Sequence, residues 1–313
     1  MLLAAGRGVR FLPATESIPK PLFPFLNVPL VRTHLRQLAD AGVSEVGINL
    51  HHLGDAIERH VTEEPVAAPR VRFFREPVIL GTAGALANAA DWLRGGDFLV
   101  VNSDTAIEPD FTALLTRHRE SGRAATLLVT ENTSPARFTP LVARGDRIVG
   151  FGGETSWPLL YTGVCVLAPR LLPRIPPGER SLVSDLWKPL TDGAEEEIGW
   201  VFHGGPSSDL GTPRDFLRAT RQALTRGGAL FSESREVRRS DPGPFTHALA
   251  RFRVRLERPR SRLDRAGSAC DRKCRLGRRR GRRGRRADRL HRGRRSHSAE
   301  NLSPRHAPLG AFR

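Results

Sequence analysis

Short apolar runs of the β type alternate with amphipathic stretches over the first 225 residues, and this alternation predicts a mostly parallel sheet with helices on its faces. The expected strands are Leu2–Ala5, Val43–Leu50, Val71–Phe74, Phe98–Val101, Ala124–Thr130, Tyr161–Leu167 and Trp200–His203. The expected helices run from Leu30 to Gly42, from Gly54 to about Val61, from Gly81 to about Arg94, onward from Pro109, from Leu182 to Leu190, and from Pro213 to about Thr225. Leu141–Ala143 and Arg147–Phe151 form a predicted hairpin. The pattern by itself establishes an α/β domain.

The periodicity disappears beyond Gly227, so we expect an ordered domain at residues 1–226 and a low-complexity tail at residues 227–313. Residues 258–295 contain 18 basic side chains in 38 positions. Such a stretch cannot bury enough apolar surface to offset the entropy of its chain, and we predict that it is disordered.

Charge is divided between the same two regions. The net charge of +17 is, taken alone, typical of a protein that binds nucleic acid or a membrane surface. Residues 1–232, however, hold 24 basic and 25 acidic side chains, a net of −1, whereas residues 233–313 hold 26 and 8, a net of +18. Nucleic-acid binding is therefore expected only through the tail.

Cysteine and apolar content exclude two further classes. Three cysteines are too few for a disulfide framework and suit a reducing cytoplasm. No apolar run approaches the roughly 18 residues that would span a bilayer, and Met1–Ala5 is too short for the core of a signal peptide. We expect a cytoplasmic protein without a membrane contact, in which Cys165 is a core residue.

The first candidate for chemistry is the glycine-rich string from Leu3 to Arg10, which directly follows a strand. Glycines at Gly6 and Gly8 let backbone N–H groups approach phosphate oxygens without an intervening Cβ. Lys20 follows in a proline-stiffened segment that can hold its ammonium over the same pocket as Arg10. Two fixed cations above a nest of amides predict a cradle for polyphosphate.

The string LAAGRGVRFLPAT…PKPL resembles the signature of the sugar-1-phosphate nucleotidylyltransferases, also called nucleoside-diphosphate-sugar pyrophosphorylases. The resemblance implies a Rossmann-like α/β fold and two substrates, a nucleoside triphosphate and a sugar-1-phosphate. It leaves a homo-oligomer open. In the family this loop wraps the triphosphate, which assigns Ala4, Ala5, Gly6 and Gly8 to nucleotide binding and gives Arg10 and Lys20 both a nucleotide-binding and a catalytic role.

The resemblance also implies Mg²⁺ as cofactor. Asp104 ends a central strand, where open α/β sheets bind ligands, and Ser208–Pro213 looks like the family's Asp-x-Gly-Thr-Pro element. Asp104 and Asp209 become the expected metal ligands, with Asp104 also catalytic, because Mg²⁺ prefers oxygen donors. The alternative for Asp209 is a backbone acceptor before the helix at Pro213.

Glu76, Gly81 and Thr82 bear on the choice of base. In relatives this region lies under the nucleobase, and the wording Glu-Pro…Gly-Thr-Ala-Gly resembles the mannose-1-phosphate guanylyltransferase branch. A carboxylate only accepts hydrogen bonds, so Glu76 suits the two adjacent donors of guanine. The alternative is that Glu76 is a solvated strand end.

The expected sugar site consists of Glu154, Thr162 and Gly163, and it departs from the family pattern. Many members carry a lysine here that grips the sugar phosphate, whereas Phe151–Thr155 contains none. N-acetylmuramate-1-phosphate uridylyltransferase also lacks that lysine, and it resembles this chain again at Ile48–Asp55. Mannose-1-phosphate with GTP is therefore the first expectation. A uridylyltransferase, or a non-catalytic sensor of nucleotide sugars, is the alternative.

The tail admits two interpretations. Many relatives continue into a β-helix of hexapeptide repeats, and residues 233–313 show no such repeat. An Arg/Gly-rich run without pattern is what a GC-rich gene yields when it is read out of frame, so a frameshift between about Gly227 and Arg260 is one hypothesis, and a polybasic arm is the other. Relatives also begin the first strand two or three residues earlier, which favours a start codon upstream of Met1.

Overall fold

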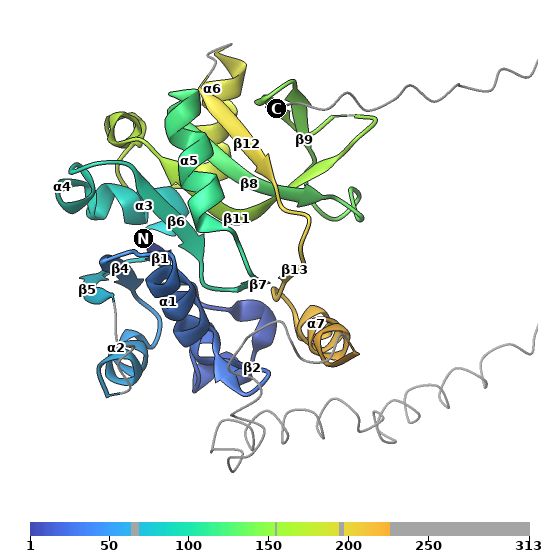
Figure 1. Cartoon of the computed structure of the whole chain (residues 1–313). Helices are drawn as coiled ribbons and strands as arrows, with labels where there is room; N and C mark the ends of the chain where they lie inside the picture. The colour runs from blue at the N-terminus through green and yellow to red at the C-terminus, as the bar shows by residue number, and fades with distance from the viewer. Residues whose placement is uncertain (64–68, 154, 194–196, 226–313) are drawn as a thin grey trace, which may run out of the picture. The chain divides into compact units, whose positions relative to one another are not determined.

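The computed structural model describes residues 1–63, 69–153, 155–193 and 197–225, and its centre is a nine-stranded sheet in the order β5-β4-β1-β6-β11-β8-β12-β10-β9 (Figure 1). Only β11 and β10 run against the other strands, so the predicted mixed, mostly parallel sheet is confirmed. The strands are β1 (Leu2–Leu3), β4 (Glu45–Leu50), β5 (Arg70–Arg75), β6 (Phe98–Asn102), β8 (Ala125–Glu131), β9 (Leu141–Arg144), β10 (Arg147–Phe151), β11 (Leu159–Leu167) and β12 (Ile198–Phe202).

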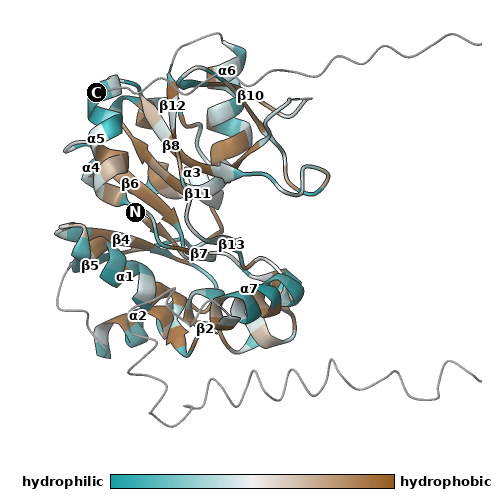
Figure 2. Ribbon diagram, turned by 45° about the vertical axis from the view of Figure 1, so that its right-hand side comes forward, coloured by the Kyte–Doolittle hydropathy of each residue, from teal (hydrophilic) through white to brown (hydrophobic). Residues whose placement is uncertain are grey.

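Alternating side chains of the central strands feed two hydrophobic cores, one on each face of the sheet. Leu2 and Val101 belong to one core, Leu3 and Val100 to the other. The first core packs against α1 (Leu30–Asp40), α2 (Gly54–Glu63) and α5 (Phe111–Ser121); the second packs against α3 (Gly81–Asn88), α4 (Ala90–Leu93) and α6 (Lys188–Asp192). Hydrophobic residues follow the inner strands and hydrophilic ones the outer faces of the helices (Figure 2).

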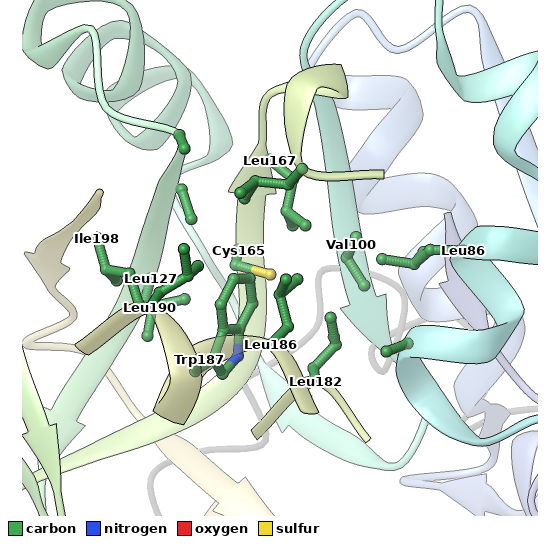
Figure 3. Close-up of a cluster of buried hydrophobic side chains, with 14 of the residues drawn as sticks. Leu86, Val100, Leu127, Cys165, Leu167, Leu182, Leu186, Trp187, Leu190 and Ile198 are labelled. Carbon is green, nitrogen blue, oxygen red and sulfur yellow. The ribbon is translucent and has the colours of Figure 1, made fainter. Parts of the chain in front are cut away.

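The core beneath α6 surrounds Trp187, a fully buried side chain that lies beside Cys165 and Leu186 (Figure 3). Cys165 is also fully buried, as predicted, and burial raises the pKa of its thiol to about 12. Trp187 ends a π-helical turn, Leu182–Trp187, that runs directly into α6. The helix predicted over Leu182–Leu190 is therefore an irregular one, and the helix predicted from Gly81 breaks at Ala89 into α3 and α4.

Two short ribbons were not predicted. β2 (Pro24–Phe25) pairs with β3 (Val28–Pro29), and β7 (Thr105–Ile107) pairs with β13 (Ser207–Asp209). With three residues each, β7 and β13 carry too little alternation to stand out in a sequence. The second ribbon brings a late segment of the chain to the end of β6 (Figure 1).

The last described helix, α7 (Pro213–Thr225), starts at the predicted proline and packs on the N-terminal third of the chain. Its Phe216 ring makes edge-on contacts with three phenylalanines, at centroid distances of 5.8 to 6.3 Å, namely Phe11, Phe23 and Phe25. Among the described residues no helix is long and apolar enough to cross a membrane. The predicted tail at residues 227–313 lies outside the described residues.

Candidate functional site

A cavity of about 300 Å³ opens where β1, β4 and β6 end. Its wall contains most of the residues that the sequence assigned to phosphate and nucleotide binding: Ala4, Ala5, Gly6, Gly8, Arg10, Lys20, Gly81, Thr82 and Asp104. The carboxyl ends of parallel strands and the loop after the first strand thus meet in one place, as expected for an open α/β sheet.

The glycine-rich loop is held in shape by its own contacts. Gly8 has a left-handed φ of 61°, and a Cβ there would lie 2.8 Å from the Thr15 methyl carbon. Thr15 in turn donates a hydrogen bond to the Gly8 carbonyl oxygen at 3.1 Å. A Cβ on Gly6, in contrast, would have no atom within 4 Å. Packing therefore requires glycine at Gly8, while the space at Gly6 stays open on the cavity side.

Lys20 lies deep in the cavity wall beside the aspartate that ends the central strand. Its Nζ is 2.7 Å from Oδ2 of Asp104, and the lysine is only 7% exposed. A short 3₁₀ turn, Lys20–Leu22, begins after Pro19 and fixes the backbone from which the side chain projects. A buried ammonium needs a charged partner, and Asp104 supplies it while one edge of its carboxylate remains on the cavity.

Asp209 does not line the cavity itself; it lies in the late β13 segment, two residues before Gly211, which does line it. It pairs in register with Thr105, and the next N–H, that of Leu210, donates to the Asp104 carbonyl oxygen at 3.1 Å. Burial and the negative charge of Asp104 raise the pKa of Asp209, whereas Lys20 and Arg10 act in the opposite direction. Each of these two carboxylates makes the charged form of the other less favourable, so the pair favours a cation beside it.

Gly211 makes this arrangement sterically feasible. A Cβ there would lie 2.7 Å from Nη1 of Arg10 and 2.9 Å from both carboxylate oxygens of Asp209. The side chains of Arg10 and Asp209 therefore both lie close to Gly211, and a side chain at this position would have to displace their ends.

The donor set fits Mg²⁺. Within the described ranges no group of three or more His, Cys, Asp or Glu could enclose a metal. Two carboxylates with the remaining positions taken by phosphate oxygens and water match the octahedral, oxygen-only preference of this ion. Asp104 and Asp209 are the residues that would hold it, and their role as ligands stays a prediction.

Glu76 lies behind the cavity wall and is 4% exposed. Its Oε1 accepts from Asn49 Nδ2 at 2.7 Å, and its Oε2 accepts from the Leu80 N–H at 3.0 Å. Glu76 is thus not the solvated strand end that was the alternative, and both of its oxygens already have donors. Direct contact with a base stays a prediction, and it would require this side chain to turn.

Asn49 is a cavity residue that the sequence reading missed. Its Oδ1 accepts from the Ala4 N–H at 2.7 Å, so one amide joins the glycine-rich loop to Glu76. The sequence signal that could have identified it is a polar asparagine near the end of an otherwise apolar strand.

The turn from Gly81 to Gly84 docks against the segment that precedes the π-helical turn. The Ala83 N–H donates to the Arg180 carbonyl oxygen at 2.8 Å, and the Thr82 hydroxyl accepts from the Leu182 N–H at 2.8 Å. Gly81 has φ 70°, and a Cβ on it would lie 2.4 Å from the Arg180 oxygen. Gly81 and Thr82 therefore line the cavity mainly with backbone atoms.

The three predicted sugar-site residues have different positions. Thr162 is buried, and its hydroxyl donates to the Leu128 carbonyl oxygen of the neighbouring strand at 2.8 Å. Thr162 does not line the cavity. Gly163 has φ 86°, and a Cβ there would lie 2.7 Å from Nδ2 of Asn102, a cavity residue next to Ser103 and Asp104. Glu154 lies outside the described residues.

Fold and site together define a class, the proteins with the nucleotide-diphospho-sugar transferase fold. The structure is similar to HddC from Yersinia pseudotuberculosis, with TM-score 0.60, 22% identity and coverage of 71% of this chain and 97% of that chain. It is also similar to a putative glucose-1-phosphate thymidylyltransferase from Bacillus anthracis, with TM-score 0.63, 19% identity and coverage of 71% and 93%. At these identities the likeness shows the fold alone.

Sequence comparison gives the family. Residues 1–151 match the nucleotidyl transferase family model. The mannose-1-phosphate guanylyltransferase of Mycobacterium tuberculosis is 30% identical over 233 residues, which are 72% of this chain and 64% of that protein. The catalytic subunit beta of the Dictyostelium discoideum enzyme is 29% identical over 227 residues, 69% and 62% of the two chains. The chain thus spans less than two thirds of the length of these relatives, and its residues 1–151 belong to the nucleotidyl transferase family, as the resemblance predicted.

Proposed function

We propose that the protein transfers a nucleoside monophosphate from a nucleoside triphosphate to a sugar-1-phosphate and releases pyrophosphate. The observation that carries this proposal is that Lys20 and Asp104 line one cavity together with the glycine-rich loop, while Asp209 beside it interacts with their charges. Cations, backbone amides and carboxylates at one cavity are what phosphoryl chemistry needs for charge neutralisation and alignment.

GTP and mannose-1-phosphate are the proposed substrates. Both relatives named above carry the name mannose-1-phosphate guanylyltransferase, and a second HddC structure is described as complexed with GMP-PN, a name that points to a guanine nucleotide. We place the reaction in the cytoplasm on the basis of the cysteine content.

The chemistry requires no general base, because the attacking phosphate oxygen is already an anion at neutral pH. That oxygen forms a bond to the α-phosphorus, and the bond from the α-phosphorus to the bridging oxygen of pyrophosphate breaks. Arg10 and Lys20 screen the α-phosphoryl group and the departing pyrophosphate, which holds the negative charge that develops. The amides of Ala5 to Gly8 orient the triphosphate.

Asp104 and Asp209 have the second task. These carboxylates would hold a Mg²⁺ ion, which would supply positive charge to the reacting phosphates. Lys20 holds one oxygen of Asp104 by a hydrogen bond, and the β7–β13 ribbon sets the spacing of the two acids. The protein therefore contributes alignment from two segments that lie about a hundred residues apart.

Pyrophosphate release measured with GTP, UTP, dTTP, CTP and ATP, each against a panel of sugar-1-phosphates, tests the proposal. We expect the highest kcat/KM for GTP with mannose-1-phosphate. Turnover that is highest with UTP would instead support the uridylyltransferase that the missing lysine favours. No turnover with any pair, together with retained binding of a nucleotide sugar, would support the sensor and overturn the catalytic proposal.

A further inference from the structure

An ion pair joins the Asp209 segment to the far half of the sheet. Arg137, in the loop between β8 and β9, donates from Nη1 to Oδ1 of Asp215 at 2.7 Å and from Nη2 to Oδ2 of the same carboxylate. Asp215 lies 78 residues further along, in the first turn of α7. A two-point contact between a guanidinium and a carboxylate fixes orientation as well as distance.

The carboxylate of Asp215 is fully engaged. It is 2% exposed, and its Oδ2 also accepts from the Thr212 hydroxyl at 2.5 Å while its Oδ1 accepts from Arg218 at 3.2 Å. The Asp215 N–H donates back to the Thr212 hydroxyl at 3.2 Å, which completes a reciprocal cap of α7. Loss of Arg137 would leave this buried charge with one exposed cation and one hydroxyl.

The cap lies directly next to the proposed metal ligand. Thr212 follows Gly211, and a Cβ on Gly211 would lie 2.9 Å from both carboxylate oxygens of Asp209, so this stretch of backbone lies close to that carboxylate. Any displacement of Thr212 would therefore move Asp209 relative to Asp104.

We propose that the Arg137–Asp215 pair is a clamp that sets the position of Asp209 opposite Asp104 and thereby the affinity of the site for a divalent cation. Arg137 is a positioning residue, since it acts through Asp215 and Thr212. The inference rests on the proposed function, in which Asp104 and Asp209 hold the metal. It adds that a loop of the other half of the sheet controls that site.

The test measures how much Mn²⁺ strengthens GTP binding in the full chain, without sugar phosphate. Calorimetric titration of GTP is performed once in EDTA and once in saturating Mn²⁺, and the ratio of the two affinities is the readout. Loss of a group that orients a metal ligand typically costs 10- to 100-fold in metal affinity. We expect Arg137→Met to reduce the ratio at least about tenfold, with an unchanged GTP affinity in EDTA. Arg137→Lys keeps the positive charge but not the two-point contact, so its ratio should lie between those of the wild type and Arg137→Met.

Arg123→Met is the matched control. Arg123 also binds both oxygens of one carboxylate, that of Asp146, at 2.9 Å. It lies just before the start of β8, whereas Arg137 follows the end of that strand. This variant should lose thermal stability without a change in the Mn²⁺ ratio. If Arg137→Met does not fold, the Arg137→Lys ratio decides, because a wild-type ratio in that variant overturns the clamp.

The outcomes separate the clamp from the proposed function. A wild-type protein in which Mn²⁺ strengthens GTP binding, with the same ratio in Arg137→Met, overturns the clamp alone. A wild-type protein in which Mn²⁺ has no effect overturns both the metal assignment and the clamp.

Discussion

The two halves of the sheet contribute to the site in different ways. In the nucleotide half, which we define as β5, β4, β1 and β6 with their loops, parallel strands end side by side. Ala4 to Gly8 follow β1 and Asp104 follows β6 within a few positions, whereas Lys20 lies in the longer segment after β1. In the acceptor half, β11, β8, β12, β10 and β9, strand directions are mixed, and polar groups such as Thr162 are used within the sheet. In this half, the contacts that affect the site are made by loops, and they join residues that are far apart in the sequence.

This difference places the carboxylates in two different settings. Asp104 belongs to the nucleotide half, and its ion-pair partner Lys20 lies in the same half, 84 residues earlier in the chain. Asp209 depends on a three-residue ribbon and on the cap of α7. The first position is therefore fixed by contacts within one half, whereas the second depends on contacts that join segments of both halves.

The largest expected effect is on Asp104, which the nucleotide half holds in place. Asp104→Asn keeps the shape but removes the charge that pairs with Lys20 and would bind the metal. We expect turnover to fall on the order of 10²- to 10³-fold while the far-UV circular dichroism spectrum stays that of the wild type. Asp91→Asn, at an aspartate whose side chain is 94% exposed, is the control. Normal turnover in the Asp104 variant would remove that residue from the mechanism.

The next effect concerns the acceptor half and appears in stability. Hydrogen bonds from Arg137 hold the pKa of Asp215 at about 2, against the effect of burial. Because the folded pKa is depressed, the stabilisation is present above pH ~4 and is lost as the pH falls from about 4 to 2. Asp215→Asn should lower the free energy of unfolding at pH 7 by roughly 2 kcal/mol and flatten its dependence on pH below 4. Urea denaturation at a series of pH values measures both, and a variant as stable as wild type at pH 7 would contradict the assignment.

Alanine substitutions at two glycines of the same loop distinguish a loss of stability from a loss of nucleotide binding. Gly8→Ala should cost about 1–2 kcal/mol of stability, since its left-handed φ and the Thr15 methyl group leave no room for a Cβ. Gly6→Ala has room for the methyl group and should fold as the wild type does. If phosphate approaches Gly6, that variant should bind GTP at least about tenfold more weakly, equivalent to ~1.4 kcal/mol. Equal GTP affinity in Gly6→Ala and wild type would place the phosphates elsewhere.

The strands of both halves were largely predictable from the sequence, whereas the long-range contacts that position Asp209 were not. Gly6, Gly8, Arg10 and Lys20 lie within fifteen residues and were found together as one motif. The hairpin of β9 and β10 and the start of α7 at Pro213 also have local signals.

The missed features have no local signal. Arg137 and Asp215 are 78 residues apart, and nothing near either residue in the sequence indicates the other. The β7–β13 ribbon is too short to show a period. The burial of Glu76 depends on Asn49 from a neighbouring strand, so a carboxylate expected at the cavity surface lies behind it.

The smallest expected effect is that of deleting residues 233–313. Every residue assigned here to phosphate, metal or clamp precedes residue 219. A chain ending at residue 232 should therefore keep kcat/KM within about twofold of the full chain, a difference of roughly 0.4 kcal/mol. A much larger loss would show that the tail, whether a polybasic arm or a frameshift product, contributes to the site or to assembly.

The central claim is that one cation binds between the carboxylates of Asp104 and Asp209, which are positioned in two different ways. Anomalous diffraction from crystals grown with Mn²⁺ and GDP-mannose tests it most directly. The account predicts a single strong peak within about 2.3 Å of a carboxylate oxygen of Asp104 and of Asp209 and of a phosphate oxygen. A peak that contacts phosphate but neither aspartate, or one that contacts Asp104 while Asp209 points away, would contradict it.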